Sequence, residues 1–234
     1  HFGVVVDDVD FLESLASFLQ SNYQLSSNNT FITGMSNGGE ICYSLAFDGS
    51  NVFKAFAPVA GSVFPNGTIN NLFNPNIPAP MFVTHGYNDN TSFYDGDLFD
   101  QFWGPYLSVD TLVDFWINSN SLNNVIIDTF PDLNNDGNIT ISKKHFSSST
   151  NNEVWLYSHN NGHNWGDSDI VIEQEIWDFF SLYINNSTQV IELNENRNLI
   201  SIYNLLGQEH LNSKNTFLFY QYDNGEVEKK IIID

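Results

Sequence analysis

The run Phe31–Gly39, which reads Phe-Ile-Thr-Gly-Met-Ser-Asn-Gly-Gly, constrains the fold of this chain more than any other feature. Apolar residues before it predict a short strand, and apolar residues at helical spacing after it predict a helix. Gly-x-Ser-x-Gly between them predicts a strained turn that exposes Ser36 as a nucleophile. We expect side chains at positions 34 and 38 to clash with the flanking strand and helix. An ordinary glycine-rich turn is the alternative.

Strands and helices are predicted to alternate through the first 183 residues. Apolar residues recur at helical spacing in 7–23, after the serine turn, in 109–119 and in 170–183. Short apolar runs bounded by turn residues predict strands at 53–60, 80–85, 125–130, 139–146 and 153–157. This order indicates an α/β fold with a mostly parallel sheet flanked by helices.

The pattern changes near Asn185, where helical periodicity ends and a polar linker follows. Short β-like runs are predicted at 189–193, 199–203, 216–222 and 227–233. We therefore expect two domains, an α/β domain at 1–185 and a small all-β module at 186–234.

Charge and composition exclude several classes of protein. Seven Lys+Arg against 28 Asp+Glu give a formal net charge of −21, which disfavours binding to nucleic acid or to anionic membrane surfaces. The single cysteine, Cys42, excludes an internal disulfide and a cysteine-based zinc site, and we expect it to be a buried core residue. No stretch is long and apolar enough to predict a membrane span, and we expect no cofactor or metal.

A serine hydroxyl needs a histidine to take its proton and a carboxylate to orient that histidine. In α/β-hydrolases these groups follow sheet strands in the order Ser, Asp/Glu, His. Here Asp89 follows the strand predicted at 80–85, and His163 follows the strand predicted at 153–157. Ser36, Asp89 and His163 are therefore the predicted catalytic triad.

The sequence offers rival residues for the roles of Asp89 and His163. Asp95 and Asp97 share the loop of Asp89 but lie farther from the strand end, and His159 lies too close to its strand to reach the serine. We expect His85 to be a structural hydrogen-bonding residue beneath the acid loop. The other three histidines are expected to be exposed: His1, His145 and His210.

The oxyanion hole needs two backbone donors. The N–H of Asn37, directly after the nucleophile, is one candidate, and the second donor normally comes from an early loop of the fold. The chain begins at His1 without a methionine or a signal peptide, so we expect an N-terminal portion with the first strands and this loop to precede it.

Four separated motifs resemble secreted esterases of the polyhydroxybutyrate depolymerase/feruloyl esterase family. They span roughly residues 1–183 in the right order: Asp7–Leu12, Gly34–Gly39, His85–Asp89 with Tyr94–Gly96, and Gly162–Trp165. The resemblance implies an α/β-hydrolase that lacks its first strands and acts on carboxylic esters, with Ser36, Asp89 and His163 matching the triad. Gly166 departs from the family, which usually has proline after the motif tryptophan, and the early histidine–glycine oxyanion segment is absent.

The C-terminal run Ile202–Gln208, with the ending Glu228–Ile233, resembles the sorting domain of proteins exported by the bacterial type IX secretion system. The resemblance implies a secreted or cell-surface bacterial protein whose β module meets the secretion machinery. A carbohydrate-binding or spacer module is the alternative.

Two other patterns invite a functional interpretation. Asp132–Asn138 begins like a calcium-binding loop, but Lys143 occupies the position of the bidentate glutamate, so a polar turn is the better interpretation. The aromatic loop at 93–106 either lines an acyl or phenolic pocket or packs on itself as a lid. The candidate pocket residues are Tyr94, Trp103 and Trp165.

The leading hypothesis is a secreted serine esterase that acts through an acyl-enzyme on Ser36. Its substrate would be polymeric hydroxyalkanoate, feruloylated polysaccharide or acetylated sugar. The alternatives are a serine peptidase of the prolyl-oligopeptidase type and a non-catalytic surface-binding protein.

Overall fold

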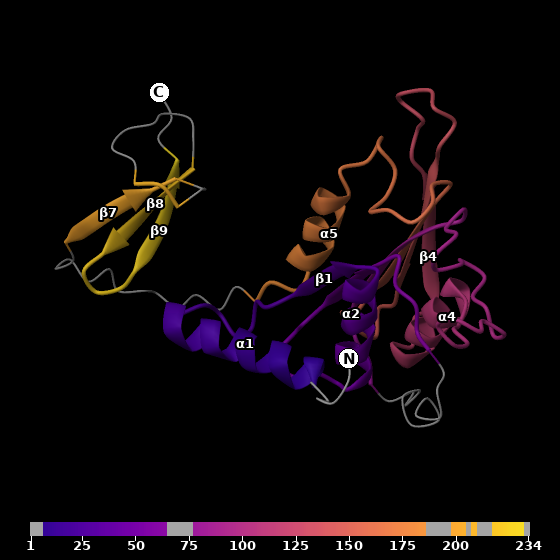
Figure 1. The fold of residues 1–234 in the computed structure, drawn as a ribbon, viewed down its shortest axis with the longest axis horizontal. Helices are drawn as coiled ribbons and strands as arrows, with labels where there is room; N and C mark the ends of the chain where they lie inside the picture. Colours follow the sequence, from indigo (N-terminus) through magenta and orange to yellow (C-terminus); the bar gives the residue numbers. More distant parts are fainter. Residues whose placement is uncertain (1–6, 65–76, 186–197, 205–206, 210–216, 232–234) are drawn as a thin grey trace. The chain divides into compact units, whose positions relative to one another are not determined.

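The computed structural model describes residues 7–64, 77–185, 198–204, 207–209 and 217–231 (Figure 1). The chain divides into two compact units. The first comprises residues 1–18 and 26–185, and the second comprises residues 19–25 and 186–234.

The first unit contains a six-stranded sheet with the strand order β1-β2-β3-β6-β5-β4. Four strands run parallel: β1 (Ile32–Met35), β2 (Phe56–Val59), β3 (Met81–Gly86) and β6 (Val154–His159). The last two strands, β5 (Thr140–Phe146) and β4 (Asn124–Thr129), are antiparallel. The sheet is therefore mixed. Four of its six strands are parallel, as predicted, and residues 130–139 join β4 to β5 as an antiparallel hairpin at one edge.

Four helices accompany the described part of the sheet: α1 (Asp8–Tyr23), α2 (Asn37–Phe47), α4 (Val109–Ser119) and α5 (Ile172–Ser181). The local sequence explains why α4 begins where it does. The Ser108 hydroxyl caps the helix by accepting a 3.2 Å hydrogen bond from the Thr111 N–H, and Asp110 places a negative charge in the first turn. All four lie within or close to the helices predicted from apolar spacing.

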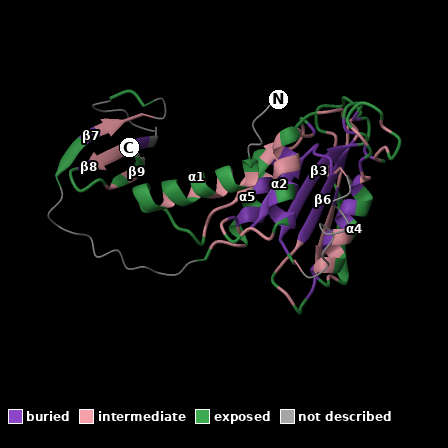
Figure 2. Cartoon of the chain, turned by 60° about the horizontal axis from the view of Figure 1, so that its bottom comes forward, coloured by how far each residue is buried: buried purple, intermediate pink, exposed green. Residues whose placement is uncertain are grey.

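Two hydrophobic cores lie on opposite faces of the sheet. The larger one packs α2 and α4, together with Val9, Leu12 and Ala16 of α1, against alternate residues of the central strands, such as Met81 and Val83. The other core packs α5 against the intervening residues of the same strands. Figure 2 shows β3 and β6 buried between these layers, which explains why both strands begin with an unbroken apolar run.

The second unit contains a three-stranded antiparallel sheet in the order β7-β8-β9. Its strands are β7 (Leu199–Tyr203), β8 (Phe217–Tyr222) and β9 (Val227–Ile231). These match three of the four runs that were predicted to be β. The fourth run, 189–193, lies outside the described residues.

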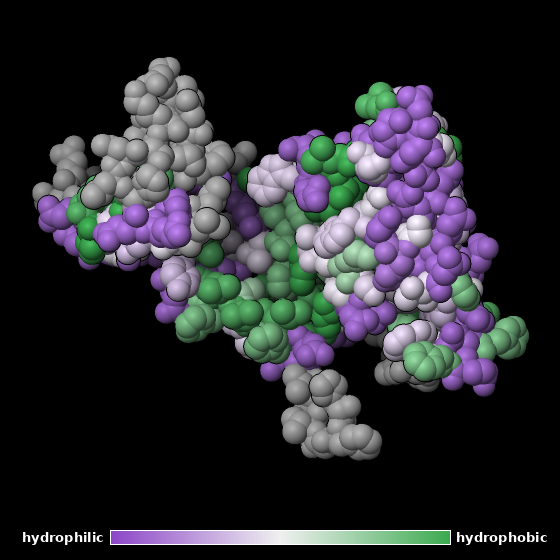
Figure 3. All heavy atoms as spheres, turned by 45° about the horizontal axis from the view of Figure 1, so that its top comes forward, coloured by the Kyte–Doolittle hydropathy of each residue, from purple (hydrophilic) through white to green (hydrophobic). Residues whose placement is uncertain are grey.

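Exposed apolar side chains form patches between hydrophilic residues on the face drawn in Figure 3. Across the described surface, the largest exposed fractions of apolar side chains are 84% at Phe99 and 81% at Phe102, both in the aromatic loop. Among the described residues, no helix is both long and apolar enough to cross a membrane.

Candidate active site

Ser36 lies on a sharp turn between β1 and α2. Its backbone has φ 58° and ψ −120°, in the region that non-glycine residues rarely adopt. The Ser36 N–H donates to the Val59 carbonyl at 2.9 Å, while the Ser36 carbonyl accepts hydrogen bonds from the N–H groups of Gly39 and Glu40. The turn is therefore tied to β2 on one side and to the first turn of α2 on the other.

The glycines around Ser36 have unequal roles. A Cβ at Gly34 would lie 2.5 Å from the Gly38 carbonyl oxygen, so this position requires glycine as expected. A Cβ at Gly38 would meet nothing within 4 Å, so the expected clash there is wrong. The second position that requires glycine is Gly39, where no clash was predicted from the sequence. A Cβ there would lie 2.8 Å from the Val59 carbonyl oxygen.

Asp89 lies in the loop after β3 and is 3% exposed. Its Oδ1 accepts hydrogen bonds of 2.8 Å from the backbone N–H groups of Thr91 and Ser92. Its Oδ2 lies 2.8 Å from His163 Nδ1 and 3.3 Å from His85 Nε2. Burial alone would raise the pKa of Asp89, but the hydrogen bonds from the two histidines and the two N–H groups lower it to about 2. Asp89 is therefore a carboxylate at neutral pH.

His163 lies in the loop after β6, and its side chain is 20% exposed. Because Nδ1 bonds to Asp89, Nε2 is the ring nitrogen left to face a substrate or the serine. Among the described residues, no hydrogen bond joins the Ser36 hydroxyl to His163. Free enzymes of this kind often have such contacts loose and tighten them when substrate binds.

The loops that carry Asp89 and His163 approach closely at Gly86. A Cβ at Gly86 would clash with the carbonyl oxygens of Asn161 and Gly162, and the Asn88 N–H donates to the Asn161 carbonyl at 3.3 Å. Glycine at the end of β3 therefore lets the two loops meet.

The rival residues have other environments. Asp95 is exposed, and Asp97 accepts a hydrogen bond from the Phe99 N–H within its own loop. His159 belongs to β6 and is fully buried, and burial followed by the nearby His85 lowers its pKa to about 4. His85 Nε2 lies 2.7 Å from the Ser92 carbonyl oxygen, which agrees with a structural role beneath the acid loop.

Of the three histidines expected to be exposed, only His145 is described. It is half-buried in β5, so that expectation is wrong for it. His1 and His210 lie outside the described residues.

Ser36 opens into a cavity of about 290 Å³, which we call the serine cavity. Polar and aromatic residues line it: Ser36, Asn37, Glu40, Ser62, Phe64, Thr91, Ser92, Trp103 and Tyr106. Of the three candidate pocket residues, Trp103 is a lining residue. Trp165 is 41% exposed and does not line this cavity.

Tyr94 has a different environment from that expected of a pocket residue. It is 6% exposed, and its hydroxyl lies 2.9 Å from the Ser158 hydroxyl and 3.1 Å from an Asp110 carboxylate oxygen. The side chain joins the aromatic loop to β6 and α4 from inside the core. The expectation that Tyr94 lines the pocket is therefore corrected.

The backbone N–H of Asn37 lies at the start of α2, directly after Ser36. Asn37 is the first residue of α2, so its N–H has no partner within the helix, and it lines the serine cavity beside Ser36. A helix N-terminus also favours negative charge. Asn37 is therefore a suitable donor to an oxyanion formed at Ser36.

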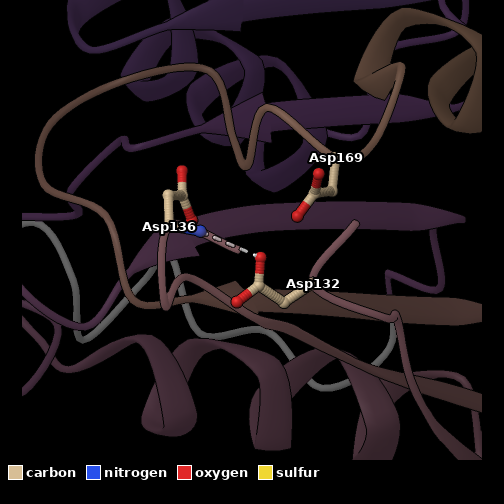
Figure 4. A group of neighbouring side chains, drawn as sticks. All are labelled: Asp132, Asp136 and Asp169. Carbon is tan, nitrogen blue, oxygen red and sulfur yellow. Dashed lines mark hydrogen bonds between the residues drawn. The ribbon is translucent and has the colours of Figure 1, made fainter. Parts of the chain in front are cut away.

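A group of three carboxylates lies away from this cavity. Oxygens of Asp132, Asp136 and Asp169 lie within 4.8 Å of one another, as Figure 4 shows. Residues 130–139 form the turn between β4 and β5, as expected, and Asp169 is the member that sequence spacing missed. The three carboxylates could offer ligands to a cation. However, each of them already accepts a hydrogen bond from a backbone N–H group, and exposed acidic groups are common without an ion.

A strained serine after one parallel strand, with an aspartate and a histidine after two others, fits an α/β-hydrolase-like fold. The positions agree with the rule that sites in such sheets form beyond the carboxyl ends of the strands.

Comparison with known proteins gives limited similarity. No protein-family profile matches the chain. Over 100 residues the chain is 30% identical to a probable feruloyl esterase C from Aspergillus niger, a match that covers 42% of this chain and 35% of that protein. The match thus spans about a third of that curated relative. Among solved structures, an acetyl xylan esterase from Aspergillus awamori superposes with a TM-score of 0.47 and 11% identity, over 75% of this chain and 67% of that one.

Proposed function

We propose that this protein is a serine hydrolase of carboxylic esters. The observation that carries the proposal is the Asp89–His163 hydrogen bond of 2.8 Å in the loops beside the strained Ser36. The similarity to a probable feruloyl esterase over 42% of the chain supports it. A mere glycine-rich turn would need neither the carboxylate nor the oriented imidazole.

The proposed mechanism proceeds in two halves. His163 Nε2 takes the proton of the Ser36 hydroxyl as Ser36 Oγ bonds to the ester carbonyl carbon, while Asp89 stabilises the imidazolium through Nδ1. The Asn37 N–H donates to the resulting oxyanion. The oxyanion then collapses, the alcohol leaves with the proton from His163, and an acyl group remains on Ser36. Water, deprotonated by His163, releases the acid in the same way.

The substrate class within this proposal includes polymeric hydroxyalkanoates and feruloylated or acetylated polysaccharides. We propose further that the protein is secreted or displayed at a bacterial cell surface. The β7–β9 sheet would serve there as a sorting module for the secretion machinery. Fusing residues 186–234 to a reporter in a bacterium with type IX secretion tests this point: export supports it, and retention in the cell contradicts it.

The decisive experiment labels the protein with a fluorophosphonate probe and measures turnover of 4-nitrophenyl esters. We expect labelling at Ser36 and ester turnover, both lost in Ser36→Ala, because the hydroxyl is the nucleophile. Ser181→Ala is the matched control, since Ser181 is an exposed serine at the end of α5, lines neither the catalytic turn nor its cavity, and donates its hydroxyl to the Asp178 carbonyl.

Other outcomes distinguish the alternatives. A protein that never labels at Ser36 is not a serine hydrolase, and the surface-binding alternative would then be favoured over the esterase. Faster cleavage of short peptides than of short esters would instead favour a peptidase.

A further inference from the structure

A second cavity of about 230 Å³ adjoins the serine cavity. Its lining residues come from α2 and from the segment after β2: Glu40, Tyr43, Ser44, Phe47, Ser62, Val63 and Phe64. Glu40, Ser62 and Phe64 line both cavities. The two spaces therefore meet at these three residues and form one cleft that begins at the nucleophile.

Glu40 is the only ionisable carboxyl group among the residues that line either cavity, and none of those residues is lysine or arginine. Its side chain is half-buried one helical turn after Ser36. Burial raises the pKa of Glu40, and the charge of the nearby His163 lowers it. A carboxylate in this position attracts hydrogen-bond donors and repels other carboxylates, and partial burial strengthens both effects.

The second cavity has another polar group without a partner. The Tyr43 hydroxyl is buried and makes no hydrogen bond within the described residues. A buried hydroxyl without a partner is costly, and most such groups are satisfied by water or by a bound ligand. Tyr43 therefore brings to this cavity a buried hydroxyl whose hydrogen bond the described residues do not supply.

We propose that the second cavity is a binding subsite for an uncharged, hydroxyl-bearing part of the ester substrate, and that Glu40 selects against substrates with a free carboxylate. This inference rests on the proposed function. Glu40 accepts a hydrogen bond from a substrate hydroxyl, and its charge excludes anionic esters from the cleft. Ser36 and Trp103 line the serine cavity and not the second one, so the subsite lengthens the cleft without supplying a reacting group.

The test compares matched neutral and anionic esters at pH 8. One pair carries the charge on the acyl group (4-nitrophenyl hexanoate and the mono-4-nitrophenyl ester of adipic acid). The other pair carries it on the alcohol side (4-carbamoylphenyl acetate and 4-carboxyphenyl acetate). The measured quantity is the ratio of kcat/KM for the neutral ester to kcat/KM for the anionic one.

We expect the wild type to prefer the neutral ester in at least one pair, and Glu40→Gln to reduce that preference roughly tenfold because it removes one nearby negative charge. Glu173→Gln is the matched control. It removes an exposed charge from the first turn of α5, so the preference should stay as in the wild type. Tyr43→Phe should raise KM for esters of sugars without lowering the free energy of unfolding, a combination that a purely structural hydroxyl would not give.

An unchanged ratio in Glu40→Gln for both pairs overturns the subsite, provided that the wild type hydrolyses these esters. If the wild type hydrolyses none of them and does not label with fluorophosphonate, the proposed function fails instead. The two failures are therefore distinguishable.

Discussion

His163 Nδ1 lies 2.8 Å from Asp89 Oδ2, although 74 residues separate the two along the chain. The same carboxylate oxygen also lies 3.3 Å from His85, and the other oxygen accepts two backbone N–H groups. Asp89 is thus fixed from four directions and holds the imidazole of His163 in one orientation. This rigidity is what a general base needs.

We expect Asp89→Asn to lower kcat for ester hydrolysis by about 10⁴-fold, because an amide cannot stabilise the imidazolium or fix its tautomer. Asp95→Asn is the control, since Asp95 is an exposed carboxylate in the same loop and its loss should change kcat less than about threefold. Steady-state kinetics on a 4-nitrophenyl ester measures both. Equal losses in the two variants would exclude Asp89 as the acid of the triad.

Gly34 and Gly38 form a matched pair for testing the serine turn. Gly34→Ala places a methyl group 2.5 Å from the Gly38 carbonyl oxygen, and we expect it to destabilise the protein by about 2 kcal/mol. Gly38→Ala meets no atom within 4 Å and lies in α2, so we expect a gain of up to about 1 kcal/mol in the free energy of unfolding. Urea denaturation of both variants measures these changes in the free energy of unfolding. A loss of stability in Gly38→Ala would contradict the open space found around Gly38.

The elements of the first unit were predictable because burial imposes a period on the sequence. The predicted strands at 80–85 and 153–157 contain the unbroken runs Met81–Val83 and Val154–Tyr157, because β3 and β6 are covered on both faces. The polar turn predicted the hairpin of β4 and β5, but its pairing with β6 was not predictable, because apolar spacing does not show which strand of the sheet a hairpin joins. The order of Ser36, Asp89 and His163 along the chain placed the candidate triad at the strand ends.

Side-chain environments in the site depended on contacts across distant segments. In the sequence, Tyr94 cannot be distinguished from the other aromatic residues of its loop. In the structure, its hydroxyl bonds to Ser158 and Asp110 in the core. Glu40 belongs to no recognisable motif, and its proposed role in substrate selection follows only from its position in the lining of both cavities. Asp169 joins Asp132 and Asp136 although it lies 33 residues after Asp136, so a search by spacing could not find it.

His159 predicts a pH dependence of stability. Its pKa falls from 6.5 to about 4 because burial, and then the proximity of His85, disfavours the protonated form. The unfolded chain binds a proton here between about pH 6.5 and 4 while the folded protein does not, so stability falls as pH decreases through this window. We expect a loss on the order of 2 to 3 kcal/mol from this group.

Urea denaturation at pH 7.5, 6, 5 and 4 checks this expectation. His159→Gln should have a shallower decline over the same window, because glutamine does not titrate. Parallel curves for the wild type and His159→Gln would contradict a buried neutral histidine.

Trp103 and Tyr94 belong to one aromatic loop but should respond oppositely to substitution. Trp103 lines the serine cavity and is 61% exposed, so Trp103→Ala should raise KM for aromatic esters roughly tenfold and change the free energy of unfolding by less than about 0.5 kcal/mol. Tyr94→Phe removes a buried hydroxyl from Ser158 and Asp110 and should cost about 1 to 3 kcal/mol of stability with KM nearly unchanged. Kinetics and denaturation on both variants separate substrate contact from support of the loop. A rise in KM for Tyr94→Phe without loss of stability would instead indicate that Tyr94 contacts the substrate.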